Sequence, residues 1–201
     1  MIRIGKYQIA FSLLFSWLMK ILLLLMFIFE FYTQNFVVAA AALFALLISL
    51  LPVAISRNYK INLPWLIDFS VTLVLFLHIV GLFYDLYHNP VWWRWDILTH
   101  FLGTAVTAFL AFYIIFALDY TKKIKLTLPL MALSTWTTAL AIGALWEISE
   151  YYFDLIFATQ AIINLADTIH DLLFDLLGAV IVSLVGVIYV NKLRKKKQNG
   201  V

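Results

Sequence analysis

Acidic side chains that are able to bind metals or move protons gather in three stretches of this chain. Asp96 precedes His100 by four residues, and Glu147 precedes Glu150 by three. The third stretch repeats an acid every four residues with an imidazole beside it, as Asp167, His170, Asp171 and Asp175. Spacings of three and four residues place side chains on one face of a helix. Each stretch therefore predicts a polar stripe along a helix.

Oxygen-rich ligand sets that include imidazole are typical of Mg, Mn, Zn or Fe sites. We therefore predict a bound divalent metal. Its candidate ligands are Asp96, His100, Glu147, Glu150, Asp167, His170, Asp171 and Asp175. Paired carboxylates from facing helices can bridge two ions, and one ion with shared protons fits the pattern equally well.

A metal in this position would activate water for attack on a phosphoryl or acyl centre. The candidate catalytic residues are Glu147, Glu150 and His100, with a spare Glu or His moving the proton. Asp96, Asp167 and Asp171 also have a structural interpretation, because free N–H groups and the dipole at a helix N-terminus favour carboxylates. Glu147 and Glu150 lie toward the C-terminal end of an apolar segment, where the dipole opposes negative charge, so they need a counter-cation or protons.

The helices that must position these residues are very apolar. Hydrophobic residues make up 65% of the 201 residues and charged residues 12%, with a mean hydropathy of +0.98, so polar groups are too few to cover a soluble globule. At about 1.5 Å per helical residue, six segments are long enough to cross a hydrocarbon core of about 30 Å. They are residues 7–29, 36–55, 64–84, 95–118, 126–149 and 167–190.

We predict an all-α, polytopic membrane helix bundle with six transmembrane helices in a single domain over residues 1–191. A basic cytoplasmic tail follows at residues 192–201, and its charge suits anionic lipid rather than nucleic acid. The chain has no cysteine, which excludes disulfides, thiolate nucleophiles and Cys-ligated metal centres.

Loop charge predicts the orientation, because Lys and Arg concentrate in alternate connections. These residues are Arg3, Lys6, Arg57, Lys60, Lys122, Lys123, Lys125 and the basic tail. Both termini are therefore predicted to be cytoplasmic, and the three acidic stripes share the outer leaflet. We expect a multi-pass protein of a prokaryotic plasma membrane.

Other polar residues inside the spans carry separate predictions. Small residues Gly103, Thr107 and Ala111 continue the Asp96 stripe as a packing seam. Lys20 either pairs with a buried acid of another helix or directs its amine toward the cytoplasm. His78 is expected to bond a neighbour, with a role as an extra ligand as the alternative. Asp119 is expected to form a solvated ion pair with the lysines beside it.

The same three stretches resemble the uncharacterised inner-membrane proteins of the YjdF type. The matching residues are Trp95-Asp96 through His100-Phe101 with Gly103, Trp146-Glu147 with Glu150, and Asp167-Thr168 with Asp171, Asp175, Gly178 and Ala179. A similar Asp-to-His spacing and a late Asp-rich helix give a more distant resemblance to VanZ-like membrane proteins. The resemblance implies a multi-spanning membrane protein and supports this choice of residues, but it brings no reaction.

Three functions fit these patterns. The first is a metal-dependent hydrolase or transferase that acts on a lipid or lipid-linked substrate from the outer leaflet, with membrane lipids as its partners. The second is a proton- or cation-coupled transporter or channel, which is disfavoured because the stripes are polar only near their outer ends. The third is a static metal-bound or proton-shared cluster that holds the helix bundle together, with the function residing in partners.

Overall fold

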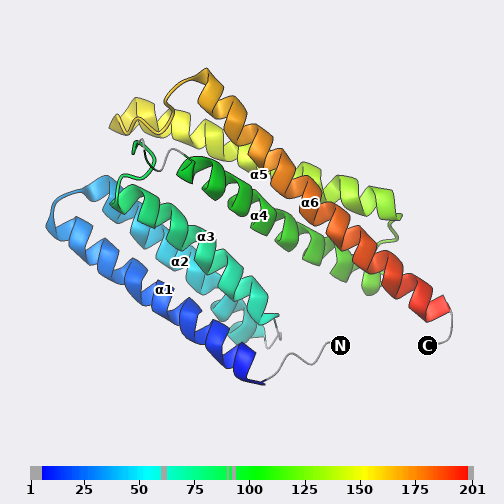
Figure 1. Ribbon diagram of the computed structural model, residues 1–201. Coiled ribbons are helices and arrows are strands. Elements are labelled where there is room, and N and C mark those ends of the chain that lie inside the picture. Colours follow the sequence, from blue (N-terminus) through cyan, green and yellow to red (C-terminus); the bar gives the residue numbers. More distant parts are fainter. Residues whose placement is uncertain (1–5, 60–62, 90, 92–93, 199–201) are drawn as a thin grey trace. The chain divides into compact units, whose positions relative to one another are not determined.

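The protein is built from long helices joined by short connections. The computed structural model describes residues 6–59, 63–89, 91 and 94–198 (Figure 1). Within these ranges it has no strand, and its six helices are α1 (Lys6–Tyr32), α2 (Phe36–Tyr59), α3 (Trp65–Phe83), α4 (Trp95–Tyr120), α5 (Leu128–Phe157) and α6 (Leu165–Gln198). All six are long and apolar enough to cross a membrane. The predicted all-α class with six spans is confirmed; Arg3, Lys60 and residues 199–201 lie outside the described residues.

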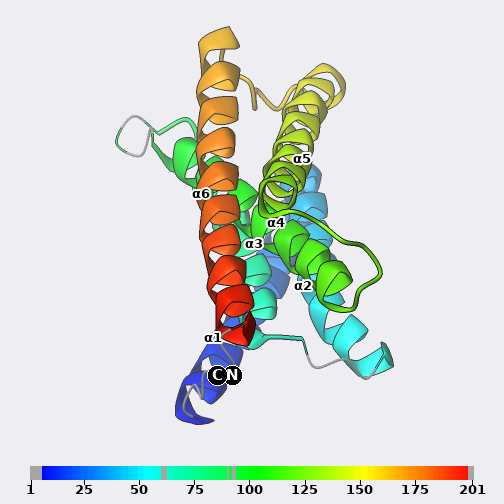
Figure 2. The ribbon, with the colours of Figure 1, turned by 90° about the vertical axis from the view of Figure 1, so that its right-hand side faces the viewer.

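Helices α5 and α6 extend well past the predicted spans. With 30 and 34 residues, they are about 45 Å and 51 Å long, and so exceed a hydrocarbon core of about 30 Å. Helix α6 runs on through Lys192 to Gln198, so this part of the predicted basic tail is helical (Figure 2). Helix α5 continues through Glu150 and Asp154 and ends at Ala158, which has a left-handed backbone with φ 52°.

Asp154 organises the connection between α5 and α6. Its carboxylate accepts hydrogen bonds from the Thr159 hydroxyl at 2.5 Å and from the backbone N–H groups of Ala161 at 2.7 Å and Ile162 at 2.9 Å. These contacts satisfy donors in a segment that has no regular structure of its own. Asp154 therefore has a structural role in this loop.

The chain divides into two compact units, Met1–Trp95 and Asp96–Val201. In the first unit, α1, α2 and α3 pack against one another. Their apolar core is formed by Leu23, Ala42, Ala45 and Ile79. The assignment of residues 1–191 to a single domain stays a prediction, and each unit is described by itself.

The second unit contains α4, α5 and α6, which meet in two apolar layers. Ala108, Ala139 and Ala179 form one layer, and a second, bulkier layer consists of Phe112, Met131 and Val190. Small residues let the helix backbones approach closely. At Gly178, a Cβ atom would lie 2.6 Å from the backbone oxygen of Phe101, so this crossing of α4 and α6 requires glycine.

The buried face of α4 is displaced by one residue from the predicted packing seam. Its fully buried positions below His100 are Thr104, Ala108 and Phe112, whereas Gly103, Thr107 and Ala111 are half-buried. The hydroxyl of Thr107 bonds the backbone oxygen of Gly103 in its own helix. Helices α5 and α6 contact the face that carries Ala108 and Phe112, and a packing seam at Gly103, Thr107 and Ala111 stays a prediction.

Asp119 links α4 to α6 at the end of the second unit where α4 ends and α5 begins. It accepts a hydrogen bond at 2.8 Å from Arg194 Nη2, which also donates to the backbone oxygen of Leu126 at 3.1 Å. The backbone N–H of Leu126 donates in turn to Asp119. The predicted lysine partner is wrong, because α6 is long enough to bring Arg194 to the α4–α5 connection.

Candidate metal site

His100 lies where the ends of three helices meet in the second unit. Helices α4 and α6 begin, and α5 ends, at the same end of this unit (Figure 1). His100 Nε2 lies 3.5 Å from Asp96 Oδ1 and 3.5 Å from Glu147 Oε1. Its other ring nitrogen, Nδ1, lies 3.4 Å from Asp175 Oδ1 of α6. The imidazole is thus surrounded by carboxylates from all three helices.

Two groups of side chains place their ligand atoms within 4.8 Å of one another. One group is Asp96, His100 and Asp171, and the other is His100, Glu147 and Glu150. The structure therefore brings five of the eight predicted ligands together. Their spacing allows a single ion to contact several of them.

The other three predicted ligands lie outside both groups. Asp167 accepts a hydrogen bond from the backbone N–H of Ile163 at the start of α6, as expected for a carboxylate at a helix N-terminus. His170 has an exposed side chain. Asp175 is buried one helical turn below Asp171 and contacts the opposite side of the His100 ring.

Glu147 is the most unusual of the clustered acids. Only 6% of it is exposed, and both of its carboxylate oxygens lack a hydrogen-bond partner among the described residues. Across the described part of the chain, His100 is the only basic side chain within 4.0 Å of this carboxylate. Burying a carboxylate without partners costs several kcal/mol by Born-type estimates. The position therefore calls for a counter-cation or for a proton on this carboxylate.

Glu150 and Asp175 have hydrogen-bond partners that the acidic spacing did not predict. Glu150 Oε1 accepts a hydrogen bond from Trp146 Nε1 at 2.8 Å. Asp175 Oδ1 accepts one from the Thr104 hydroxyl at 2.5 Å. Thr104 lies four residues after His100, so the helical spacing that predicted the stripe also places this hydroxyl on it.

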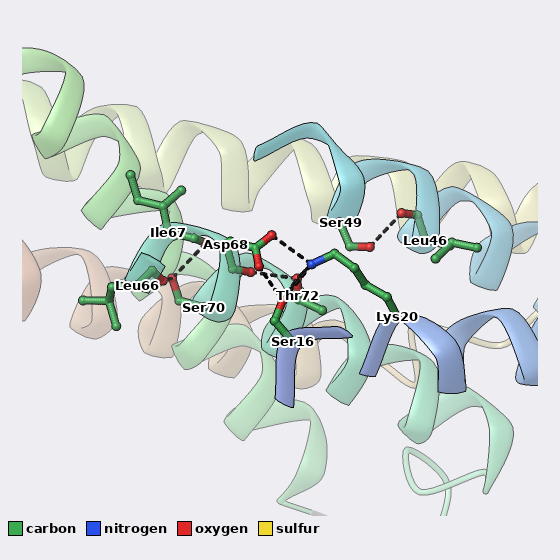
Figure 3. Close-up of polar contacts among 9 residues, drawn as sticks. All are labelled: Ser16, Lys20, Leu46, Ser49, Leu66, Ile67, Asp68, Ser70 and Thr72. Carbon is green, nitrogen blue, oxygen red and sulfur yellow. Dashed lines mark hydrogen bonds and ion pairs between the residues drawn. The ribbon is translucent and has the colours of Figure 1, made fainter. Parts of the chain in front are cut away.

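A second buried polar cluster lies in the first unit (Figure 3). Lys20 Nζ donates to Ser16 Oγ at 2.7 Å, Asp68 Oδ1 at 2.8 Å and Thr72 Oγ1 at 2.9 Å, and Ser16 donates to Asp68 Oδ2 at 2.6 Å. All three ammonium protons of Lys20 therefore have acceptors. The pairing of Lys20 with a buried acid is confirmed, and its partner, Asp68, was missed.

The histidine of α3 has a neighbour as expected. His78 Nδ1 lies 2.8 Å from the Tyr87 hydroxyl in the segment after α3. In the same segment, the Asp85 carboxylate lies 2.6 Å from His88 Nδ1. Both contacts belong to the first unit.

A family model described as "Predicted membrane protein (DUF2238)" matches residues 15–192. The chain belongs to this family. The DUF2238 match covers all of the clustered acids and the Lys20 cluster. The more specific YjdF-type and VanZ-like names stay predictions.

One relative and the solved structures complete the comparison. A Thermotoga maritima protein described as "Uncharacterized protein" is 34% identical over 110 residues, which are 52% of this chain and 53% of the relative. The match thus spans about half the length of that relative. No solved structure matches the chain.

Proposed function

We propose that this multi-pass membrane protein binds a divalent metal at the cluster around His100. The observation that carries the proposal is the buried Glu147 carboxylate, whose oxygens both lack hydrogen-bond partners within the described residues. Asp96, Asp171 and Glu150 lie around the same imidazole. A donor set of carboxylates with one imidazole suits Mg, Mn, Zn or Fe.

The proposed activity is metal-dependent hydrolysis of a lipid or lipid-linked substrate. Asp96, His100, Glu147 and Asp171 would hold the metal, which would supply the Lewis acidity that activates water for attack on a phosphoryl or acyl centre. Glu150 is half-buried; it takes the proton of that water and returns it to the leaving oxygen. The loop charges support a site in the outer leaflet of a prokaryotic plasma membrane.

The residues around and beneath the cluster favour a lipid enzyme over a transporter. Ile148, Tyr151 and Tyr152 are large, exposed side chains on the same end of α5, as suits contact with lipid chains and the membrane interface. Below the cluster, the two apolar layers that contain Ala139 and Met131 occupy the space between the helices. An ion pathway would require polar or hydrated side chains along this route, whereas the buried hydroxyls of Thr135 and Ser183 donate to backbone oxygens of their own helices.

Metal content of the purified protein tests the proposed site. We expect wild type in detergent to retain stoichiometric divalent metal, and Glu147→Gln to lose it, because the amide lacks the anionic ligand charge. Glu30→Gln is the matched control, since Glu30 is also 6% exposed but lies on α1 in the other unit. The measurement is metal analysis by mass spectrometry after desalting. Absence of metal from wild type, or equal metal in Glu147→Gln, would overturn the proposal.

The reaction is tested separately in proteoliposomes. We expect release of phosphate or fatty acid from a panel of phospholipids and lipid diphosphates, abolished by a chelator and restored by the metal found in the purified protein. Glu30→Gln should behave as wild type. Metal binding without turnover of any of these lipids would contradict the hydrolase and leave a structural metal site.

A further inference from the structure

We propose that Asp175 is a positioning residue rather than a metal ligand, and that it orients His100 so that Nε2 binds a single ion. This inference rests on the proposed metal site.

The two ring nitrogens of His100 face different partners. Nε2 is equidistant from Asp96 Oδ1 and Glu147 Oε1, at 3.5 Å from each. Nδ1 faces Asp175 Oδ1 at 3.4 Å. A neutral imidazole carries one proton and one free lone pair. A proton on Nδ1, directed at Asp175, leaves the Nε2 lone pair directed at the acids of α4 and α5.

One histidine shared by both ligand groups, with Nε2 at 3.5 Å from an acid of each, favours one ion. His100 belongs to the group with Asp96 and Asp171 and also to the group with Glu147 and Glu150. The lone pair of Nε2 can bind one metal only. The two groups therefore form a single coordination shell, in which carboxylates of α4, α5 and α6 surround one ion.

Asp175 is held in place by groups that are not metal ligands. It is 1% exposed, and its Oδ1 accepts the Thr104 hydroxyl at 2.5 Å. Its Oδ2 has no hydrogen-bond partner in the described part of the chain and occupies the space that a Cβ at Gly143 would fill. Asp175 belongs to neither ligand group. A carboxylate that fixes the second nitrogen of a metal-binding histidine sets both its tautomer and its ring orientation.

Gly143 offers a way to move Asp175 without changing its chemistry. A methyl group at this position would collide with the Asp175 carboxylate. Gly143→Ala should therefore displace Oδ1 from Nδ1 while every proposed ligand is retained. If Asp175 acts through His100, Gly143→Ala and Asp175→Asn should have effects in the same direction.

Nitrogen-15 NMR of histidine-labelled protein in detergent, with and without Zn²⁺ as the probe, tests the inference. The chain has four histidines, so single substitutions, beginning with His170→Gln, assign the signals. In wild type we expect a proton on His100 Nδ1 in both states, one Zn²⁺ per chain, and a shift of Nε2 on binding. In Asp175→Asn and Gly143→Ala, Zn²⁺ affinity should fall about 10–100-fold, and metal-free His100 should gain the Nε2–H tautomer.

The outcomes separate this inference from the proposed function. Zn²⁺ bound through Nδ1, two Zn²⁺ per chain, or unchanged affinity and tautomer in both variants would overturn the role of Asp175 and leave the metal site intact. Loss of Zn²⁺ in Asp175→Asn with an unchanged metal-free tautomer would make Asp175 a direct ligand and also overturn it. Failure of wild type to bind Zn²⁺ or any other divalent ion would overturn both.

Discussion

Replacing Lys20 by methionine is expected to lower the free energy of unfolding by about 3–5 kcal/mol. Lys20 is 2% exposed and supplies the only ammonium that the described residues show bonding to Asp68. Without it, the Asp68 carboxylate stays buried between α1 and α3, and the Ser16 hydroxyl is the only other donor to it among the described residues. Unpaired charge inside a membrane-spanning bundle is costly. The measurement is thermal or denaturant unfolding in detergent.

The double variant Lys20→Met/Asp68→Leu separates the ion pair from the packing of the two side chains. Apolar replacement of both partners of a buried ion pair is often neutral or stabilising, so the double variant should recover most of the loss. Lys192→Met, at an exposed position of α6, is the control and should change little. Additive losses in the double variant would show that the two charges are not coupled.

The six spans follow from hydropathy and length, but the helix ends do not. Apolar runs mark the hydrocarbon-crossing part of each helix, whereas backbone hydrogen bonding continues into the flanking polar residues. Helix α6 therefore continues through Lys192 and Arg194, and α5 continues past the end of its predicted span at residue 149 to Phe157, where the left-handed Ala158 caps it. A non-glycine residue with left-handed φ gives no clear signal in the sequence.

Of the eight ligands predicted from the acidic stripes, five place their ligand atoms close together. Adjacent residues of a helix point about 100° apart, so Asp171 and His170 cannot both face the cluster, and the structure buries only Asp171. Asp68 was missed for another reason. Spacing within one helix predicts a face, but only the packing of α1 on α3 shows that Ser16, Lys20 and Thr72 face Asp68.

Metal removal is expected to reverse the stability order of wild type and Glu147→Gln. In chelator, wild type must keep the buried Glu147 carboxylate without a hydrogen-bond partner among the described residues, which should cost about 1–3 kcal/mol or more for a charged group. The neutral amide of the variant avoids the charge, so the variant should unfold at a higher temperature than wild type. The measurement is a thermal unfolding series of both proteins in detergent with chelator.

With metal present, the order should reverse. An ion that binds only the folded state at about 100 times its dissociation constant adds about 2.7 kcal/mol of stability. Wild type should gain this increment as metal is titrated, and Glu147→Gln should gain little. Glu30→Gln, equally buried in the other unit, should follow wild type throughout. The contrary result is that wild type is the more stable protein in chelator and that metal leaves the unfolding temperatures of both proteins unchanged. The Glu147 carboxylate would then be stabilised by groups of the protein itself, and the reason to place a cation beside His100 would disappear.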